Sequence, residues 1–253
     1  MMQIDLNCDL GESFGAWQIG NDRQILPLIS SANVACGFHA SDPVVMRKTV
    51  QAAAKAGVAV GAHPGYPDLM GFGRRAMTLS SDEARSYMLY QLGALDAFCR
   101  TAGLRLQHVK PHGALYNMAS KDYQLARDLC EAVASYDPEL ILLGLSGGEL
   151  LHAAADIGLP FASEVFADRA YEEDGSLVSR SKPGSMITDE EEAIRRVIRM
   201  VREGKVTAIT GRDIPIRADS VCVHGDGPQA LAFVQKIREA CEAEGIGIRA
   251  LGR

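Results

Sequence analysis

A lysine and a histidine follow a strand-like run in the segment HVKPHGALYN, residues 108–117. The apolar residues just before them predict a β-strand over residues 106–110. Charge at a strand end contributes little to packing, so Lys110 and His112 are candidates for chemistry. Lys110 would stabilise negative charge developing on an oxygen, and His112 would transfer a proton or bind a metal ion. Pro111 restricts how the two side chains leave the strand.

Polar side chains recur at the ends of other predicted strands. They are Asn7, Asp9 and Glu12, then His39 and Asp42, then His63 and Asp68, then Glu164, Asp168 and Arg169, and finally His224 and Asp226. A lone histidine is more often a hydrogen-bonded structural residue. Four of the six histidines lie at such ends, however, and the carboxyl ends of parallel strands meet on one rim. The pattern therefore predicts a single site on this rim.

The chemistry of this rim is predicted to be acid–base hydrolysis. Asp9 or Glu12 would act as the general base, a histidine as the proton carrier, and Lys110 as the stabilising cation. The predicted catalytic residues are Asp9, Glu12, His39, His63, Lys110, His112, His224 and Asp226. Cys36 lies near His39, but a buried neutral thiol is the preferred interpretation of this cysteine.

A metal centre is the alternative that these residues leave open. Asp9, His63 and His112 offer one carboxylate and two imidazoles, which suit zinc or another divalent ion with open positions. The three residues are not clustered in sequence as in an HExxH motif, so this hypothesis depends on the fold. Whether a divalent metal binds stays open at this point.

Two long irregular stretches, residues 63–79 and 167–186, follow predicted strands and carry four arginines. Guanidinium groups bind carboxylate or phosphate through paired hydrogen bonds, and solvated loop charge is the alternative. The predicted substrate-binding residues are Asn7, Arg74, Arg75, Glu164, Asp168, Arg169 and Arg180. The stretch LSGGEL, residues 145–150, is interpreted as an ordinary glycine-bearing turn, with anion binding at a helix N-terminus as the alternative.

The elements that must position these residues alternate between strand and helix. Strands are predicted at residues 2–8, 31–37, 58–62, 106–110, 140–145, 161–166, 206–210, 220–225 and 246–251. Amphipathic runs between them begin with capping residues, as at Asp42 and Ser80, and end in glycine. This order predicts the α/β class: a single (β/α) barrel domain over residues 1–253, TIM-like with seven or eight strands. An open doubly wound sheet is the second choice.

Composition limits the class of partner. The chain has 253 residues, 47% of them hydrophobic, and a net charge of −6. Nucleic-acid binding is not expected, because it depends on clustered basic residues. No membrane span and no targeting segment are visible, so we expect a cytoplasmic protein. The six cysteines form no CxxC pair, and no disulfides are expected.

Seven of these segments together resemble the LamB/YcsF family. They are DLNCDLGE (5–12), ANVACGFHASD (32–42), GAHPGYPD (61–68), VKPHGALYN (109–117), EVFADRAY (164–171), SRSKPGS (179–185) and VCVHGD (221–226). The resemblance implies a barrel of the glycoside hydrolase/deacetylase type. It also implies a part in the ATP-dependent opening of 5-oxoproline to L-glutamate, together with two partner subunits, B and C. Ser41 stands where we would expect glycine, a small-for-small departure.

The implied use of ATP has no visible site in this chain. It lacks the GxxxxGK[ST] loop and the kinase signature set, so ATP is handled by the partner subunits or by an unrecognised site. Two rival functions stay open. One is a metal-dependent deacetylase of an amino sugar, and the other is a non-catalytic scaffold subunit.

Overall fold

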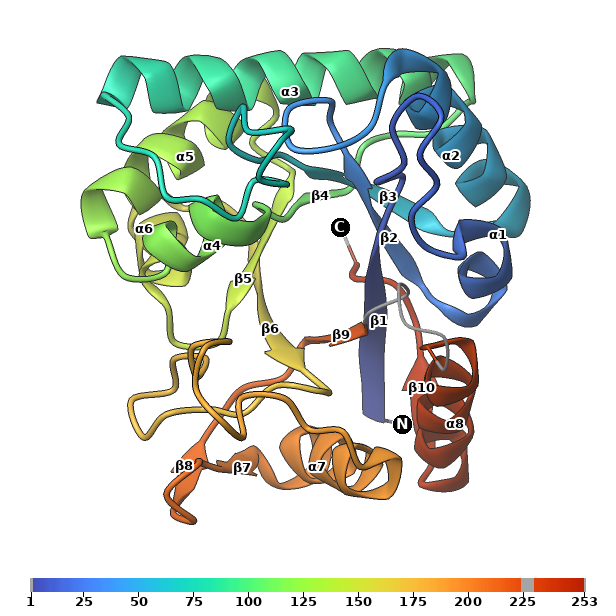
Figure 1. Cartoon of the computed structure of the whole chain (residues 1–253), viewed down its shortest axis with the longest axis vertical. Coiled ribbons are helices and arrows are strands. Elements are labelled where there is room, and N and C mark those ends of the chain that lie inside the picture. The colour runs from blue at the N-terminus through green and yellow to red at the C-terminus, as the bar shows by residue number, and fades with distance from the viewer. Residues whose placement is uncertain (1, 224–229, 253) are drawn as a thin grey trace.

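Seven parallel strands close into a barrel in the computed structural model, which describes residues 2–223 and 230–252 (Figure 1). In order around the ring they are β1 (Met2–Leu10), β2 (Ser31–Ala35), β3 (Ala59–His63), β4 (His108–Val109), β5 (Ile141–Leu145), β6 (Phe161–Phe166) and β9 (Ser220–Val223). β1 pairs with both β2 and β9, so the ring has no open edge. The predicted (β/α) barrel is therefore confirmed.

Helices surround this ring (Figure 1). They are α1 (Asp22–Ile25) with the 3-10 turn η1 (Leu26–Leu28), α2 (Pro43–Ala56), α3 (Ser81–Thr101), α4 (Gly113–Ala119), α5 (Tyr123–Tyr136), α6 (Glu149–Ile157), α7 (Glu190–Glu203) and α8 (Ala230–Ala243). The Asp42 side chain accepts hydrogen bonds from two amides of α2, and Ser80 forms a capping box with Glu83 at α3. These helix starts are as predicted. Within the described residues, no helix combines the length and apolar character needed to cross a membrane.

Two of the predicted strands do not belong to the closed ring. The run predicted at residues 206–210 is β7 (Lys205–Thr207), which pairs antiparallel with β8 (Asp213–Pro215). The C-terminal strand is β10 (Ile246–Ile248), which pairs only with the first residues of β1. The sequence predicted nine strands and a barrel of seven or eight without saying which strands lie outside it, because a short apolar run does not reveal its pairing partner.

The interior of the barrel is unusually polar. Alternate residues of β1 point outward into the apolar layer beneath the helices, and the others point inward. Asp5 accepts hydrogen bonds from the hydroxyls of Ser30 (2.7 Å) and Ser31 (2.6 Å). His108 is fully buried, with Nε2 2.7 Å from Asn33 Oδ1. Asp5 and His108 thus find hydrogen-bond partners on or directly beside a neighbouring strand.

The C-terminal segment closes the amino-terminal end of the barrel. Leu251 packs on Ile141, Leu143 and Ala162, a small apolar cluster separate from the main core. The Gln107 side-chain amide donates to the Leu251 carbonyl over 2.6 Å. Access to the interior of the barrel is thereby left to the opposite end, where the strands terminate.

Ser41 adopts a backbone conformation that favours glycine. Its φ is +74°, in the left-handed region, and the residue is buried in the loop between β2 and α2. A side chain with a Cβ makes this conformation less favourable than it is for glycine, by about 1 kcal/mol. The departure from the family pattern is therefore more than an exchange of two small residues.

Replacing Gly61 by alanine should destabilise the barrel. A Cβ at Gly61 would lie 2.1 Å from Nε2 of His108, and both residues are held by strand pairing. We expect Gly61→Ala to lose about 3 kcal/mol of unfolding free energy, measured by urea denaturation. Gly93→Ala is the matched control, because Gly93 is exposed on α3 with nothing near its Cβ position. That change should stabilise by about 1 kcal/mol. Equal stabilities of the two variants would contradict this view of the interior.

Candidate active site

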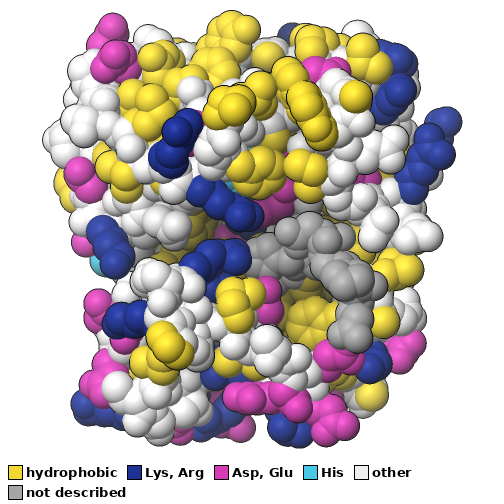
Figure 2. Space-filling model, in the orientation of Figure 1, with side chains coloured by type: hydrophobic (Ala, Val, Ile, Leu, Met, Phe, Trp, Pro, Cys, Tyr) yellow, Lys and Arg dark blue, Asp and Glu magenta, His cyan; other side chains and the backbone are white. Residues whose placement is uncertain are grey.

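A cavity of about 630 Å³ lies at the carboxyl ends of the barrel strands. Its walls come from the ends of β1, β3, β4, β5 and β6 and from the long loops after β3 and β6. The predicted residues that line it are Asp9, Glu12, His63, Arg74, Lys110, His112, Arg169 and Arg180. Basic side chains gather beside a hollow near the centre of the face in Figure 2, next to acidic ones. Eight of the residues predicted from the sequence therefore share one cavity.

Lys110 lies on the floor of this cavity and is only 3% exposed. Its Nζ is 3.0 Å from Asp9 Oδ1 and 2.7 Å from Glu164 Oε1, and it donates to Asn7 Oδ1 over 3.2 Å. Burial by itself lowers the pKa of an ammonium group. The surrounding acids, chiefly Asp9, outweigh burial and hold the pKa of Lys110 well above its ordinary value. Lys110 is thus a fixed cation.

His63 and His112 are each oriented by a backbone carbonyl. His63 Nδ1 is 2.7 Å from the carbonyl oxygen of Lys110, and His112 Nε2 is 2.8 Å from that of Phe72. A carbonyl oxygen only accepts, so both of these nitrogens carry hydrogen and donate. In neutral rings the other two nitrogens, His63 Nε2 and His112 Nδ1, then present lone pairs. They face each other at 3.0 Å, an arrangement that calls for a cation.

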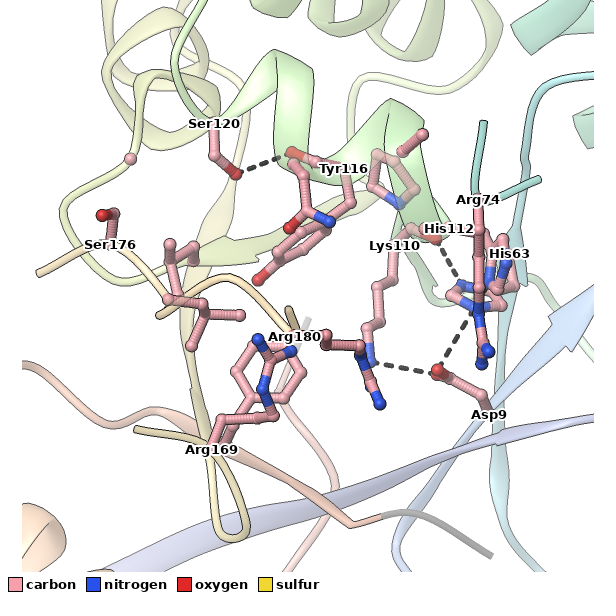
Figure 3. A pocket seen from close by; sticks show the side chains of 18 of the residues that line it. Asp9, His63, Arg74, Lys110, His112, Tyr116, Ser120, Arg169, Ser176 and Arg180 are labelled. Atoms are coloured by element: carbon pink, nitrogen blue, oxygen red, sulfur yellow. Dashed lines mark hydrogen bonds and ion pairs between the residues drawn. The ribbon is translucent and has the colours of Figure 1, made fainter. Parts of the chain in front are cut away.

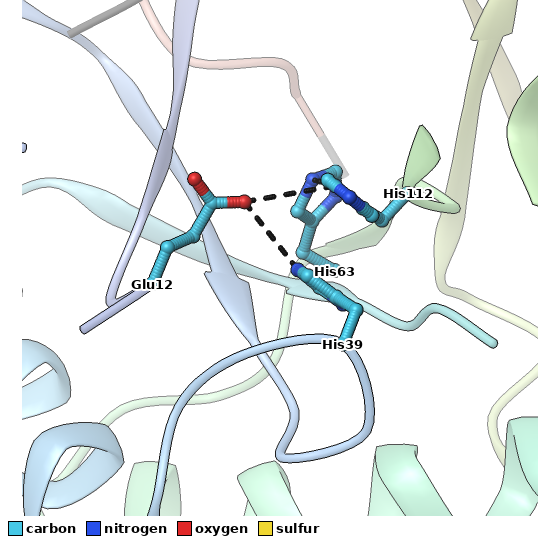
Figure 4. A group of neighbouring side chains, drawn as sticks. All are labelled: Glu12, His39, His63 and His112. Carbon is cyan, nitrogen blue, oxygen red and sulfur yellow. Dashed lines mark hydrogen bonds and ion pairs between the residues drawn. The ribbon is translucent and has the colours of Figure 1, made fainter. Parts of the chain in front are cut away.

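Two carboxylates reach the same pair of nitrogens. Asp9 Oδ2 is 3.3 Å from His63 Nε2, and Glu12 Oε1 is 3.6 Å from His112 Nδ1. Asp9 is held on β1 by the Asn33 amide, which donates to it over 2.8 Å. Figure 4 shows Glu12 directed toward the histidines. The structure therefore brings Asp9, His63 and His112 together, as the metal hypothesis requires, and adds Glu12.

His39 packs against His112. Its ring stacks on His112 with 3.7 Å between centroids and 3° between planes, and its Nε2 is 3.4 Å from Glu12 Oε1. A nitrogen lone pair lies in the plane of its ring, so two parallel stacked rings cannot both direct lone pairs at one ion. Gly73 leaves room for the stack, because a Cβ there would lie 2.7 Å from the Cβ of His39. His39 thus fixes the position of His112.

Burial keeps the stacked histidines neutral. Burial, followed by the neighbouring His63, lowers the pKa of His112 to about 3. Burial, followed by His112, lowers the pKa of His39 well below its ordinary value. These two rings are therefore uncharged hydrogen-bonding groups at neutral pH rather than standing positive charges.

The cysteines near the cavity are neutral thiols. Burial raises the pKa of Cys36 to about 12 and those of Cys8 and Cys222 well above the ordinary value. The preferred interpretation of Cys36 as a buried thiol therefore stands. All six cysteines are free and buried, and a thiol nucleophile has no support here.

The four predicted arginines take different positions. Arg74 lies over the Phe72 ring, 5.0 Å from its centroid, beside the histidines. Arg169 and Arg180 line the opposite part of the cavity (Figure 3). Arg75 lies outside it and forms an ion pair with Asp68. Arg75 is therefore not retained as a substrate ligand.

Three other predicted substrate ligands do not line the cavity. Asn7 and Glu164 are fully buried beneath it, where both contact Lys110. Asp168 lies in the loop after β6, beside Arg169. Asn7 and Glu164 therefore hold Lys110 in this structure rather than touching a ligand, and the charge of Asp168 favours the charged form of Arg169. His224 and Asp226 lie outside the described residues.

Several lining residues were not among the sequence candidates. Tyr116 lines the wall and donates to Glu164 Oε2 over 2.8 Å. Phe72 turns its carbonyl to His112 from a left-handed backbone conformation, φ +55°, which is unusual for a bulky side chain. The glycine after Phe72 hinted at a turn, but no sequence signal pointed to its carbonyl. Main-chain atoms are the same in every residue, so a contact made by a carbonyl cannot be predicted from residue types.

Comparison with known proteins gives a consistent picture. A sequence model of the LamB/YcsF family matches residues 4–253. A Clostridium beijerinckii protein, named as the A subunit of 5-oxoprolinase, is 63% identical over 248 residues, covering 98% of this chain and 97% of that one. A Brevibacillus brevis protein of the same name is 58% identical, covering 99% and 98%.

Solved structures agree on the fold. A lactam utilization protein from Thermus thermophilus superposes with a TM-score of 0.94 at 51% identity, covering 99% of this chain and 100% of that one. A family 4 carbohydrate esterase from Streptomyces lividans has a TM-score of 0.52 at 12% identity, covering 99% and 93%. The second likeness concerns the fold alone.

Removing the charge of Lys110 should lower the unfolding free energy of the protein. We expect Lys110→Met to lose about 3–5 kcal/mol, because Glu164 would then be buried without its cation. The double variant Lys110→Met/Glu164→Gln should recover most of this loss, since a neutral amide still accepts from Tyr116. Urea denaturation of both variants measures the difference. A double variant no more stable than the single one would show that this ion pair is not what stabilises the floor.

Proposed function

The chain belongs to the LamB/YcsF family, and on that basis we propose that it is one subunit of an ATP-dependent 5-oxoprolinase that opens the lactam of 5-oxo-L-proline to L-glutamate. Relatives at 58–63% identity are named as the A subunit of 5-oxoprolinase. The Thermus thermophilus structure, at 51% identity, is named a lactam utilization protein. The word subunit in these names supports partner chains, which we propose are the B and C subunits.

The observation that carries the proposal is the position of Asp9. Its carboxylate touches Lys110 and His63 at once, so a base, a fixed cation and an imidazole converge from β1, β4 and β3. All three line one cavity. Addition of water to an amide-type carbon needs a group that takes a proton and a group that stabilises the oxygen. A chain that served only to bind other subunits would not need this cluster.

The use of ATP follows from the chemistry of the substrate. A five-membered lactam is a resonance-stabilised amide whose closed form is favoured, so efficient opening requires coupling to ATP. The chain has no phosphate-binding loop of the GxxxxGK[ST] type. We therefore assign phosphorylation of the lactam oxygen by ATP to the partner subunits, with release of ADP. The present cavity would receive the activated ring.

Two waters are consumed in the steps that follow. The first adds to the ring carbon and gives its proton to Asp9 or Glu12, while the carbon–nitrogen π electrons move to the ring nitrogen. The acid so formed returns that proton to the nitrogen. Collapse then breaks the ring carbon–nitrogen bond, with a second proton passing from the new hydroxyl to the amine through the same carboxylates. The product is an acyl phosphate, which a second water converts to the carboxylate of glutamate and inorganic phosphate.

Protonation of the ring nitrogen decides whether the tetrahedral intermediate loses the amine or the phosphate. An unprotonated nitrogen is a poor leaving group, and the tetrahedral carbon would then expel phosphate and regenerate the lactam. Lys110 stabilises the oxygen on that carbon and lies next to Asp9, the proposed proton carrier. Holding both groups within 3.0 Å of each other therefore favours opening over return.

A divalent cation fits the donor set beside this floor. His63 Nε2 and His112 Nδ1 present lone pairs 3.0 Å apart, and Asp9 and Glu12 supply carboxylate oxygens near them. These residues would hold the ion, while the stacked ring of His39 would not. When bound, such an ion would lower the pKa of a coordinated water. The same observation favours the rival function, a metal-dependent amide hydrolase.

A mixing assay tests the proposed function. The chain would be combined with the B and C subunits, separately and together, and glutamate and ADP would be followed from 5-oxoproline. We expect Asp9→Asn and His112→Asn to lower kcat by about 100-fold or more, since each removes a group at the reacting centre. His152→Asn is the control, because His152 is exposed on α6 away from the cavity. Full activity of the Asp9 and His112 variants would refute the proposed site.

Metal removal separates the two functions. We expect chelator-treated chain to bind a single zinc ion per chain in calorimetry, and His112→Asn to weaken binding by at least about tenfold. His152→Asn should bind as wild type does. Full lactamase activity in the demetallated complex would exclude a metal-dependent mechanism. Absence of zinc binding by the wild-type chain would instead indicate that His63 Nε2 and His112 Nδ1 share a proton.

A further inference from the structure

The end of the cavity opposite the histidines is basic and has no assigned ligand. Figure 3 shows Arg169 across from His63 and His112 and Arg180 drawn between Arg169 and Asp9, with Lys110 between the histidines and the Ser120 and Ser176 side. Both arginines lie in the loop after β6. The turn of residues 146–148, which leads into α6, borders the same end.

Arg169 is a buried guanidinium whose charge is not balanced by an ion pair. It is 7% exposed, and one of its terminal nitrogens donates to the Val178 carbonyl over 2.6 Å, which fixes its orientation. Its Nε is buried and has no hydrogen-bond acceptor. Within residues 2–223 and 230–252, neither Arg169 nor Arg180 pairs with a carboxylate. The neighbouring Asp168 carboxylate favours the charged form of Arg169 without forming an ion pair with it, so the buried charge is only partly balanced and an incoming anion would stabilise it.

The two arginines also repel each other. Burial, followed by the nearby Arg180, lowers the pKa of Arg169. Asp174 lines this end too, but its carboxylate accepts from the Ser176 amide over 2.9 Å rather than from either arginine. An anion between the two guanidinium groups would relieve their repulsion.

The turn before α6 borders this end of the cavity, and most of its amides are used within the fold. The Ser146 amide donates to the Glu164 carbonyl over 3.1 Å, and the Gly148 amide donates to the Leu145 carbonyl over 2.9 Å. Gly148 precedes the helix, and no side chain caps its first turn. The amides at a helix start favour negative charge, most of all for anions with several oxygens. Gly148 has little room for a side chain, since a Cβ would lie 3.2 Å from the Leu145 carbonyl oxygen. Gly148 is buried, and the exposed residue of this turn is Gly147.

We infer that Arg169 and Arg180, beside the turn of residues 146–148, form a subsite for the phosphoryl group of an activated lactam. This rests on the proposed function and names the form of substrate that the cavity takes. A carboxylate balances one guanidinium, whereas a phosphoryl group carries nearly two negative charges and three acceptor oxygens. Arg74, which lies beside His112 at the other end of the cavity, would then bind the substrate carboxylate. The ring between them lies over Lys110.

Binding of inorganic phosphate to the isolated chain tests this subsite. Calorimetry with phosphate and, separately, with 5-oxoproline would compare wild type with Arg180→Gln, which changes an exposed loop residue and spares the fold. The variant should bind phosphate at least about tenfold more weakly and 5-oxoproline as wild type does. Arg105→Gln is the control, because Arg105 pairs with Glu139 away from the cavity, and it should change neither affinity.

Other outcomes would overturn the subsite. They are an unchanged phosphate affinity in Arg180→Gln, no phosphate binding by wild type at millimolar concentration, or an equal loss of 5-oxoproline binding, which would make this a carboxylate site. Failure of the subsite is distinguishable from failure of the function. Glutamate formation by the mixed complex without phosphate binding contradicts the subsite alone. Phosphate binding as expected in a chain that supports no glutamate formation contradicts the function alone.

Discussion

The structure depends on one buried ammonium group, that of Lys110. A charge with 3% exposure is tolerated only when oppositely charged groups surround it, and Asp9 on β1 and Glu164 on β6 supply them. This requirement ties three strands of the ring to one point. The backbone of Lys110 acts as well, because its carbonyl orients His63. Charge and main chain of one residue thus set the floor and one wall of the cavity.

A polar barrel interior follows from this constraint. The hydrophobic effect that holds the fold acts mostly between strands and helices, where the main apolar cluster lies. Inside the ring, serine, asparagine and histidine side chains satisfy one another from Asp5 up to Asp9. A network with every member paired is rigid. The groups at its upper end are therefore held in place before any ligand arrives, as electrostatic stabilisation of a reacting group requires.

Features set by neighbouring residues could be predicted from the sequence, and features set by distant ones could not. Asp42 and Ser80 mark helix starts because a cap acts within one turn. A strand was expected at residues 206–210 and lies at Lys205–Thr207, but its pairing outside the barrel could not be predicted, since pairing depends on segments elsewhere. Arg75 and Arg180 looked equivalent as loop arginines. Only the structure shows that Arg75 forms an ion pair with Asp68 and that Arg180 lines the cavity.

The sequence by itself determined which side chains stand at the strand ends, the order of strands and helices, and the resemblance to the LamB/YcsF family. The tertiary structure decided which of those side chains meet. The facing nitrogens of His63 and His112, the stacking of His39 and the carbonyl of Phe72 all depend on residues far apart in the chain. Their distances are fixed by strand register and loop conformation, and these follow from packing of the whole barrel rather than from any local run of residues.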